Sequence, residues 1–151
     1  QSKFLTDTRG TGVINRLFHS YAKYKGDIPG RRNGVLISND TGQAVAYALF
    51  NLQDRGVMFI SHQTPVYQGM IVGEHNRDND LEVNVLKGKK LTNVRASGTD
   101  DAVSLSPPRN LSLEDMMAYL NHDELLEVTP MKLRLRKQYL LSHERKKAAR
   151  N

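Results

Sequence analysis

The chain has 151 residues and a formal net charge of +6 at pH 7, with a sequence pI of about 9.7. This length suits one ordinary domain, or one domain with a fragment of another, and the positive charge favours an anionic partner, with nucleic acid first. The absence of cysteine excludes a disulfide framework and a thiolate zinc site, and no apolar run approaches the ~18 residues of a membrane span.

The N-terminal part combines a polar start with a long apolar run. Residues 1–9 are polar and rich in threonine, and the two glycines of 10–12 interrupt the chain. Val13 to Tyr24 mixes branched and aromatic residues with polar ones, which predicts a long strand. A lone strand with an uncovered face is unstable, so this strand needs partners. The chain lacks an initiating Met, and we expect Gln1 to be the cut end of a longer protein.

The middle of the chain predicts short strands separated by turns. Val35 to Ser38 is the first strand, Asn39 to Gly42 has hairpin-turn chemistry, and Gln43 to Phe50 is expected to return as the second strand. Residues 51–56 predict a short helical turn or loop. Further strands are expected at 57–60, 66–73 and 81–86. Strands at this spacing indicate a small barrel or sandwich.

The last third predicts helices at both of its ends. Ser112 is the expected N-cap of a helix, with Asp115 as a capping-box partner and Leu111 and Met116 as a hydrophobic staple. The residues 125–128 predict a strand, and 132–136 alternate strictly between basic and apolar residues, which predicts a strand with one face of each kind. Ser142 is expected to cap a closing helix.

Charge is segregated along this last third. Seven acidic residues lie between Asp100 and Thr129 against Arg109 alone, and eight basic residues follow from Lys132 against Glu144. The acidic block keeps that face away from RNA, or it is simply the solvated side of a helix.

The segment from Lys87 to Asp100 carries four cations and no anion before its last residue. Small hydroxyl and amide residues separate the charges, and two glycines make the segment pliable. Such spacing suits a phosphate backbone, because each cation neutralises a phosphate and releases counterions. The alternative is a solvated surface loop. The expected RNA-binding residues are Lys87, Lys89, Lys90, Asn93, Arg95 and Ser97. A loop of this length is usually functional or disordered, and we expect it to be mobile without RNA.

Two further basic clusters carry a weaker prediction of RNA binding. The first is a pair of adjacent arginines, for which an exposed turn is the alternative. The second follows the alternating strand and the closing helix, for which a solvated outer face is the alternative. The residues in these clusters are Arg31, Arg32, Lys132, Arg134, Arg136, Lys137, Arg145, Lys146 and Lys147.

Motifs for catalysis or metal binding are absent from the sequence. Gly88-Lys89 resembles the end of a phosphate-binding loop, but Lys90 stands where Ser or Thr belongs. Residues 76–80 resemble the start of a calcium loop, but Leu81 replaces its glycine and Lys87 its glutamate. No two histidines have a metal-ligand spacing, and no serine lies in a nucleophile elbow. We therefore assign no catalytic residue, no metal site and no cofactor to this chain.

Long motifs across the chain closely resemble the TypA/BipA family of ribosome-associated translational GTPases. The strongest is 84–100, Asn-Val-Leu-Lys-Gly-Lys-Lys-Leu-Thr-Asn-Val-Arg-Ala-Ser-Gly-Thr-Asp. The agreement continues, in order, through segments 31–38, 52–56, 66–75, 123–130 and 133–137.

The resemblance implies a domain order and a task. In this family a GTPase domain that binds GTP and Mg precedes β-barrel and ferredoxin-like domains, as in elongation factor G and LepA. It implies that 1–24 is the end of the ferredoxin-like fifth domain, a helix tail and its last strand, and that 25–151 is the family-specific C-terminal domain. GTP hydrolysis would then lie outside this chain. The family's long loop meets large-subunit rRNA and the acceptor arm of A-site tRNA, and it corresponds to 87–103 here.

Together these observations predict an α+β fold that is mostly β with short helices, a small barrel-like domain carrying a long basic loop. The expected partners are the ribosome, large-subunit rRNA and tRNA, for a monomer in the cytoplasm without membrane contact. The resemblance further implies support of large-subunit assembly and of growth in the cold or under other stress. The alternative is a protein-interaction module that binds a ribosomal protein through the acidic residues of 100–129.

Overall fold

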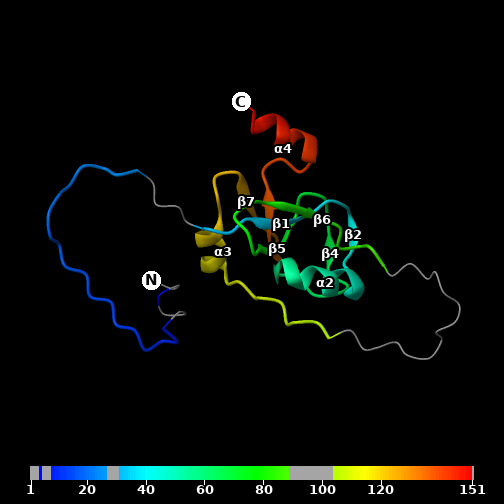
Figure 1. Ribbon diagram of the computed structural model, residues 1–151, viewed down its shortest axis with the longest axis horizontal. Helices are drawn as coiled ribbons and strands as arrows, with labels where there is room; N and C mark the ends of the chain where they lie inside the picture. The colour runs from blue at the N-terminus through cyan, green and yellow to red at the C-terminus, as the bar shows by residue number, and fades with distance from the viewer. Residues whose placement is uncertain (1–3, 5–7, 27–30, 89–103, 151) are drawn as a thin grey trace, which may run out of the picture.

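A computed structural model describes residues 4, 8–26, 31–88 and 104–150 of the chain (Figure 1). Its strands and helices are short and lie between residues 35 and 148. The strands are β1 (Val35–Ser38), β2 (Gly42–Gln43), β3 (Gly56–Met58), β4 (Pro65–Val66), β5 (Ile71–His75), β6 (Leu81–Val83), β7 (Glu124–Val128) and β8 (Leu133–Lys137). The helices are α2 (Ala46–Leu52), α3 (Leu113–Tyr119), α4 (Ser142–Ala148) and the 3₁₀ turn η1 (Gln53–Arg55).

The strands form one four-stranded sheet and two smaller ladders. The larger sheet has the order β3-β5-β1-β6, in which β1 runs antiparallel to β5 and parallel to β6. The pairs β2–β4 and β7–β8 are antiparallel two-stranded ladders. The expectation of a mostly β, α+β fold is confirmed, and within the described residues the sheets do not close into a barrel.

Strand β1 is buried on both of its faces, which makes it the centre of the fold. Leu36 packs into one apolar cluster with Leu49 of α2, whereas Val35 and Ile37 pack into a second cluster with Leu135 of β8. Alternate residues of a strand point to opposite faces, so the sheet separates two cores. Helix α2 covers one face, and α3 with the β7–β8 ladder covers the other.

Helix α3 begins where the sequence predicts. The Ser112 hydroxyl accepts the Asp115 backbone N–H at 3.1 Å, and the Asp115 carboxylate accepts the Ser112 backbone N–H at 3.3 Å. Leu111 and Met116 both pack against the second apolar cluster, as expected of a staple. The predicted capping box is therefore confirmed, and it orients α3 over the sheet.

The β7–β8 ladder is joined to the sheet beside β5. The Lys137 N–H donates to the Gly69 carbonyl at 2.9 Å, and Met70 forms an isolated bridge with Arg136. Gly69 has φ +86°, and an added Cβ would lie 2.7 Å from the Leu140 backbone. Only glycine adopts this conformation without strain while allowing so close an approach, so Gly69 holds the end of β8 against the sheet.

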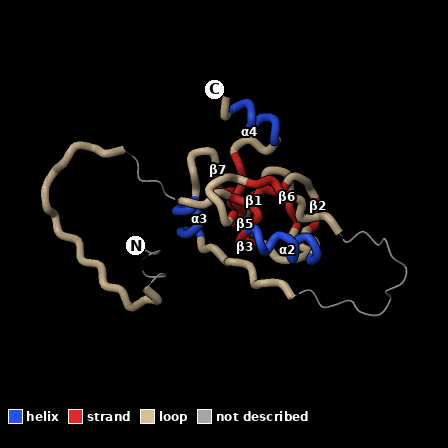
Figure 2. Tube along the Cα trace, viewed as in Figure 1, coloured by secondary structure: helices blue, strands red, loops and turns tan. Residues whose placement is uncertain are grey.

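The strand predicted at Val13–Tyr24 is wrong. Residues 8–26 form no ladder with any described residue, and Figure 2 shows them as an extended loop away from the sheets. Leu17 and Tyr21 are 94% and 95% exposed. An apolar, β-favouring composition specifies a strand only where a neighbouring strand accepts its hydrogen bonds, and the described residues supply none here.

The hairpin predicted for 35–50 is also wrong. Residues 42–43 pair with β4 rather than β1, and the chain then turns into α2. Within α2, Ala48 and Leu49 are buried and Leu52 packs against the same apolar cluster, a spacing that matches one helix face rather than alternation. Alanine is the best helix former, so the alternating alanines that suggested a strand instead support α2.

Other boundaries differ by smaller amounts. The turn predicted at 51–56 is confirmed by the end of α2 and η1, and the strands at 57–60 and 81–86 are shorter than expected. The run 66–73 is divided between β4 and β5 by a turn. The closing helix is confirmed, but its N-cap is Leu141 rather than Ser142. No helix among the described residues is long and apolar enough to span a bilayer.

Candidate nucleic-acid interface

The predicted RNA-binding loop leaves the fold after β6 and returns before α3. Lys87 and Gly88 are described and exposed. The other expected contacts, Lys89, Lys90, Asn93, Arg95 and Ser97, lie outside the described residues. The structure therefore defines the two ends of the loop, residues 84–88 and 104–109.

The departing end is held by backbone and packing contacts. The Val85 side chain is fully buried, and the Val85 carbonyl accepts the Val45 N–H at 2.9 Å. The Leu86 N–H donates to the Asn84 side-chain oxygen at 2.9 Å. Leu86 also lies against Gly42, where an added Cβ would come within 2.3 Å of the leucine. These contacts anchor the chain up to the residue before Lys87.

The returning end is held by α2, η1 and β3. Leu105 packs against the first apolar cluster, and the Ser106 N–H donates to the Gln53 side-chain oxygen. The Arg109 N–H donates to the Met58 carbonyl at 2.8 Å. Leu49 and Leu105 also line a pocket of about 130 Å³ beneath this end. The predictions from sequence missed Gln53, because no local pattern marks a side chain whose partner lies 53 residues away.

Several of the expected RNA-binding cations are instead buried within the fold. The Lys137 ammonium lies 2.6 Å from Asp80, 2.8 Å from Asp123 and 3.0 Å from Glu124. Its side chain is 2% exposed, and Glu124 is completely buried. An ammonium has three hydrogens to donate, and three carboxylates accept them. Lys137 is therefore a structural residue in this fold.

Arg31 completes the same cluster from the other side of Glu124. Its guanidinium makes a bidentate pair with the Glu124 carboxylate, at 2.6 and 2.9 Å. Arg31 also donates to the backbone carbonyls of Asn33 and Tyr119, and its charge lies 4.4 Å from the centre of the Tyr119 ring. The expectation of an exposed turn at Arg31 is wrong, although its neighbour Arg32 is exposed. We name Arg31, Asp80, Asp123, Glu124 and Lys137 the buried charge cluster.

Three other predicted cations have partners nearer the surface. Arg134 pairs with Glu127 at 2.9 Å, and Arg145 pairs with Glu82 at 2.7 Å. Arg136 donates to the carbonyl of Lys137 at 3.2 Å. The face of β8 predicted to be free and basic is thus partly neutralised by β7.

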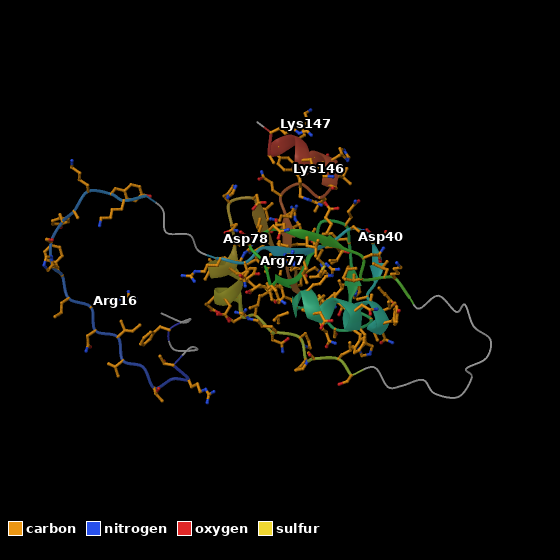
Figure 3. The ribbon with its side chains drawn as sticks, viewed as in Figure 1. Arg16, Asp40, Arg77, Asp78, Lys146 and Lys147 are labelled. Atoms are coloured by element: carbon orange, nitrogen blue, oxygen red, sulfur yellow. The ribbon has the colours of Figure 1, made fainter. Side chains whose placement is uncertain are left out.

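The remaining cations of the two weaker predicted clusters are exposed. Arg32 and Lys132 are exposed, and Lys146 and Lys147 lie on α4, which projects from the rest of the fold in Figure 3. The Arg145–Glu82 pair fixes α4 to β6, the strand that leads into Lys87. Among the described residues, no group of His, Asp or Glu side chains is arranged to hold a metal ion.

Residues 33–142 match the family model of the TypA/BipA C-terminal domain. The chain belongs to the TypA/BipA C-terminal domain family. It is 56% identical, over its whole length, to the large ribosomal subunit assembly factor BipA of Buchnera aphidicola subsp. Schizaphis graminum. It is 52% identical, over 99% of its length, to the proteins of the same name from Salmonella typhimurium and Escherichia coli strain K12. The chain spans a quarter of the length of these relatives.

The charges of this TypA/BipA C-terminal domain shift the pKa values of the side chains around them. Burial acts against ionisation of Asp123, but the hydrogen bond and charge of Lys137 outweigh it and lower the carboxyl pKa. Burial likewise acts against the charge of Lys137, and its three carboxylates raise its pKa. Hydrogen bonds from Tyr67 and Arg134 lower the pKa of Glu127, although burial opposes them. These groups are therefore ionised together at neutral pH.

Proposed function

We propose that this chain is the RNA-docking part of a ribosome-associated GTPase that supports assembly of the large ribosomal subunit. Its loop at 87–103 binds phosphates of large-subunit rRNA and of the A-site tRNA acceptor arm on cytoplasmic ribosomes. GTP and Mg act in another part of the protein, and this chain binds and positions. Support comes from relatives named as large ribosomal subunit assembly factors, which match the whole chain at 52–56% identity.

The distribution of charge carries this proposal. Ion pairs among the described residues engage five cations and six carboxylates. The whole chain has 22 cations and 16 acidic residues, so the remaining charges sum to +7. The ion pairs of the described residues therefore use no excess positive charge. That excess is left for the surface and the loop, where cations bind phosphate by releasing counterions.

The alternative of a protein-binding acidic face has less support. Asp123 and Glu124 belong to the buried charge cluster, and Glu127 pairs with Arg134. Asp115 caps α3, so most of the described acidic residues of 100–129 already have partners. Neutralised carboxylates attract a basic protein weakly, and the observations therefore favour RNA.

The salt dependence of tRNA binding tests the proposal. A variant carrying Lys89→Ala and Lys90→Ala should bind tRNA more weakly and lower the log–log salt slope by about two, because each lost phosphate contact contributes about 0.9. The matched control carries Lys23→Ala and Lys25→Ala, which remove the same charge from the described N-terminal segment. If both variants behave like the unchanged chain, the loop is not the docking site.

Crosslinking on ribosomes tests the identity of the RNA. With the complete protein bound to ribosomes, crosslinks from 87–103 should map to large-subunit rRNA and tRNA. Crosslinks from residues 104–129 to a ribosomal protein, with none from 87–103 to RNA, would instead support the acidic-face alternative.

A further inference from the structure

Helix α2 and the 3₁₀ turn η1 contact both ends of the loop. At the start of the helix, the N-cap residue Val45 donates its N–H to the Val85 carbonyl at the departing end. At the other extremity, the C-cap residue Gln53 accepts the Ser106 N–H at the returning end. One short helical unit therefore joins two chain segments that lie some twenty residues apart in sequence.

The length of this unit determines how far apart the ends are held. Val45 and Gln53 are eight positions apart, and an α-helix rises 1.5 Å per residue, so their backbones lie about 12 Å apart along the helix. Leu49, midway along, lies in the same apolar cluster as Val85 and Leu105. In Figure 1, α2 lies beside the chain that leaves after β6 and the chain that returns toward α3. The helix is thus packed against both ends as well as bonded to them.

Gln53 makes the more specific of the two connections. Within residues 104–108, its bond to Ser106 is the one hydrogen bond that the structure shows. Leu105 adds apolar contact with the first cluster, but burial of apolar surface has no directional requirement. A hydrogen bond has preferred distance and angle, so Gln53 fixes where the returning chain begins.

We propose that α2 and η1 form a strut that sets the separation of the two loop ends, with Gln53 as a positioning residue for the RNA contacts of the loop. In general, a chain whose ends are held at a fixed separation loses less conformational entropy on binding than a chain whose ends are free. The role in RNA binding rests on the proposed function, whereas the role in spacing the ends does not.

The separation of the loop ends can be measured directly with spin labels. The chain has no cysteine, so Gly88→Cys and Ser104→Cys provide two unique sites. No atom lies within 4 Å of a Cβ added at Gly88, and Ser104 is exposed, so both labels fit. Double electron–electron resonance on this chain should give one narrow distance distribution.

Substitution of Gln53 should broaden that distribution. Gln53→Met keeps the length of the side chain and removes its oxygen, and it should raise the population with a detached returning end about fivefold, the effect of one lost hydrogen bond. Gln53→Glu keeps an acceptor oxygen and should restore the narrow distribution. The control Asn51→Ala lies on the same helix and bonds only to Tyr47 within it. An unchanged distribution in Gln53→Met would overturn the strut.

RNA binding distinguishes a failure of this inference from a failure of the proposed function. Gln53→Met should weaken tRNA binding about fivefold in the otherwise unchanged chain. In a chain that already carries Lys89→Ala and Lys90→Ala, the same substitution should cause no further loss. A loss that is the same with and without the loop lysines would overturn the positioning role. If the loop lysines themselves have no effect on binding, the proposed function fails, while the spin-label result still tests the strut.

Discussion

The cations of the buried charge cluster, Arg31 and Lys137, are chemically like those of α4 but have the opposite environment. The side chains of Lys137 and Arg31 are almost completely buried and meet carboxylates from two separate segments, at Asp80 and at residues 123–124. Lys146 and Lys147 are exposed, and the structure shows no carboxylate paired with either among the described residues. The comparison teaches that the fold decides which cations hold the domain together and which remain available to a polyanion.

Removing Lys137 should have the largest effect on this comparison. Lys137→Met leaves Glu124 buried with less compensation and Asp80 and Asp123 unpaired, and breaking a buried pair in this way costs about 3–5 kcal/mol. Urea unfolding measures the loss. The control Lys132→Met, at the exposed end of the same hairpin, should change stability by less than about 0.5 kcal/mol. Equal effects of the two variants would contradict the distinction.

Adjacent arginines provide a second test of the same idea. Arg31→Met breaks the bidentate pair with Glu124, and we expect a loss of about 3 kcal/mol. Arg32→Met removes the same charge one residue later, where the side chain is exposed, and should leave the unfolding free energy unchanged within about 0.5 kcal/mol. The difference between the two midpoints in urea is the measured quantity.

Acid should remove the part of the stability that comes from the paired carboxylates. The pKa values of Asp123 and Glu127 lie below their ordinary values of 3.8 and 4.5. A carboxyl group whose pKa is lower in the folded state than in the unfolded state stabilises the fold at pH values above its unfolded-state pKa. This stabilisation is lost as the pH falls through its folded-state pKa. Stability should therefore be level from pH 7 to about 5 and fall below about 4.5. In Lys137→Met the part due to Asp123 should disappear, and an unchanged acid profile would contradict its pairing.

The exposed cations of α4 should contribute least to stability. Lys146→Ala with Lys147→Ala removes two charges that no ion pair among the described residues uses. The free energy of unfolding, measured by thermal unfolding, should therefore change by no more than about 0.5 kcal/mol. If these residues form part of the RNA surface, the same variant lowers the salt slope of tRNA binding. A marked loss of stability would assign them to the fold instead.

Local signals predicted the parts of this structure that depend on neighbouring residues. The capping box at Ser112 and Asp115 and the span of β8 follow from spacing within a few residues. Alternation along β8 places Lys137 on the same face as Leu133 and Leu135, and this is the face that the structure buries. The partners of Lys137 lie 13, 14 and 57 residues away, and such pairing depends on the sheet rather than on a motif. The alanines of α2 suggested a strand because they alternate with larger apolar residues, although alanine has the highest helix propensity.

The central position of β1 has a consequence for how the chain folds as it is made. Both neighbours of β1, namely β5 and β6, come later in the sequence. At about 5–20 residues per second, ribosomal synthesis takes roughly 2–10 s to proceed from the end of β1 to the end of β6. Until β5 is made Val35, Leu36 and Ile37 have neither edge paired, and until β6 is made one edge stays open; exposed apolar strands of this kind invite non-native association. The nascent domain therefore depends on rapid completion of β5 and β6, and slowed elongation between residues 39 and 83 should lower the yield of folded protein.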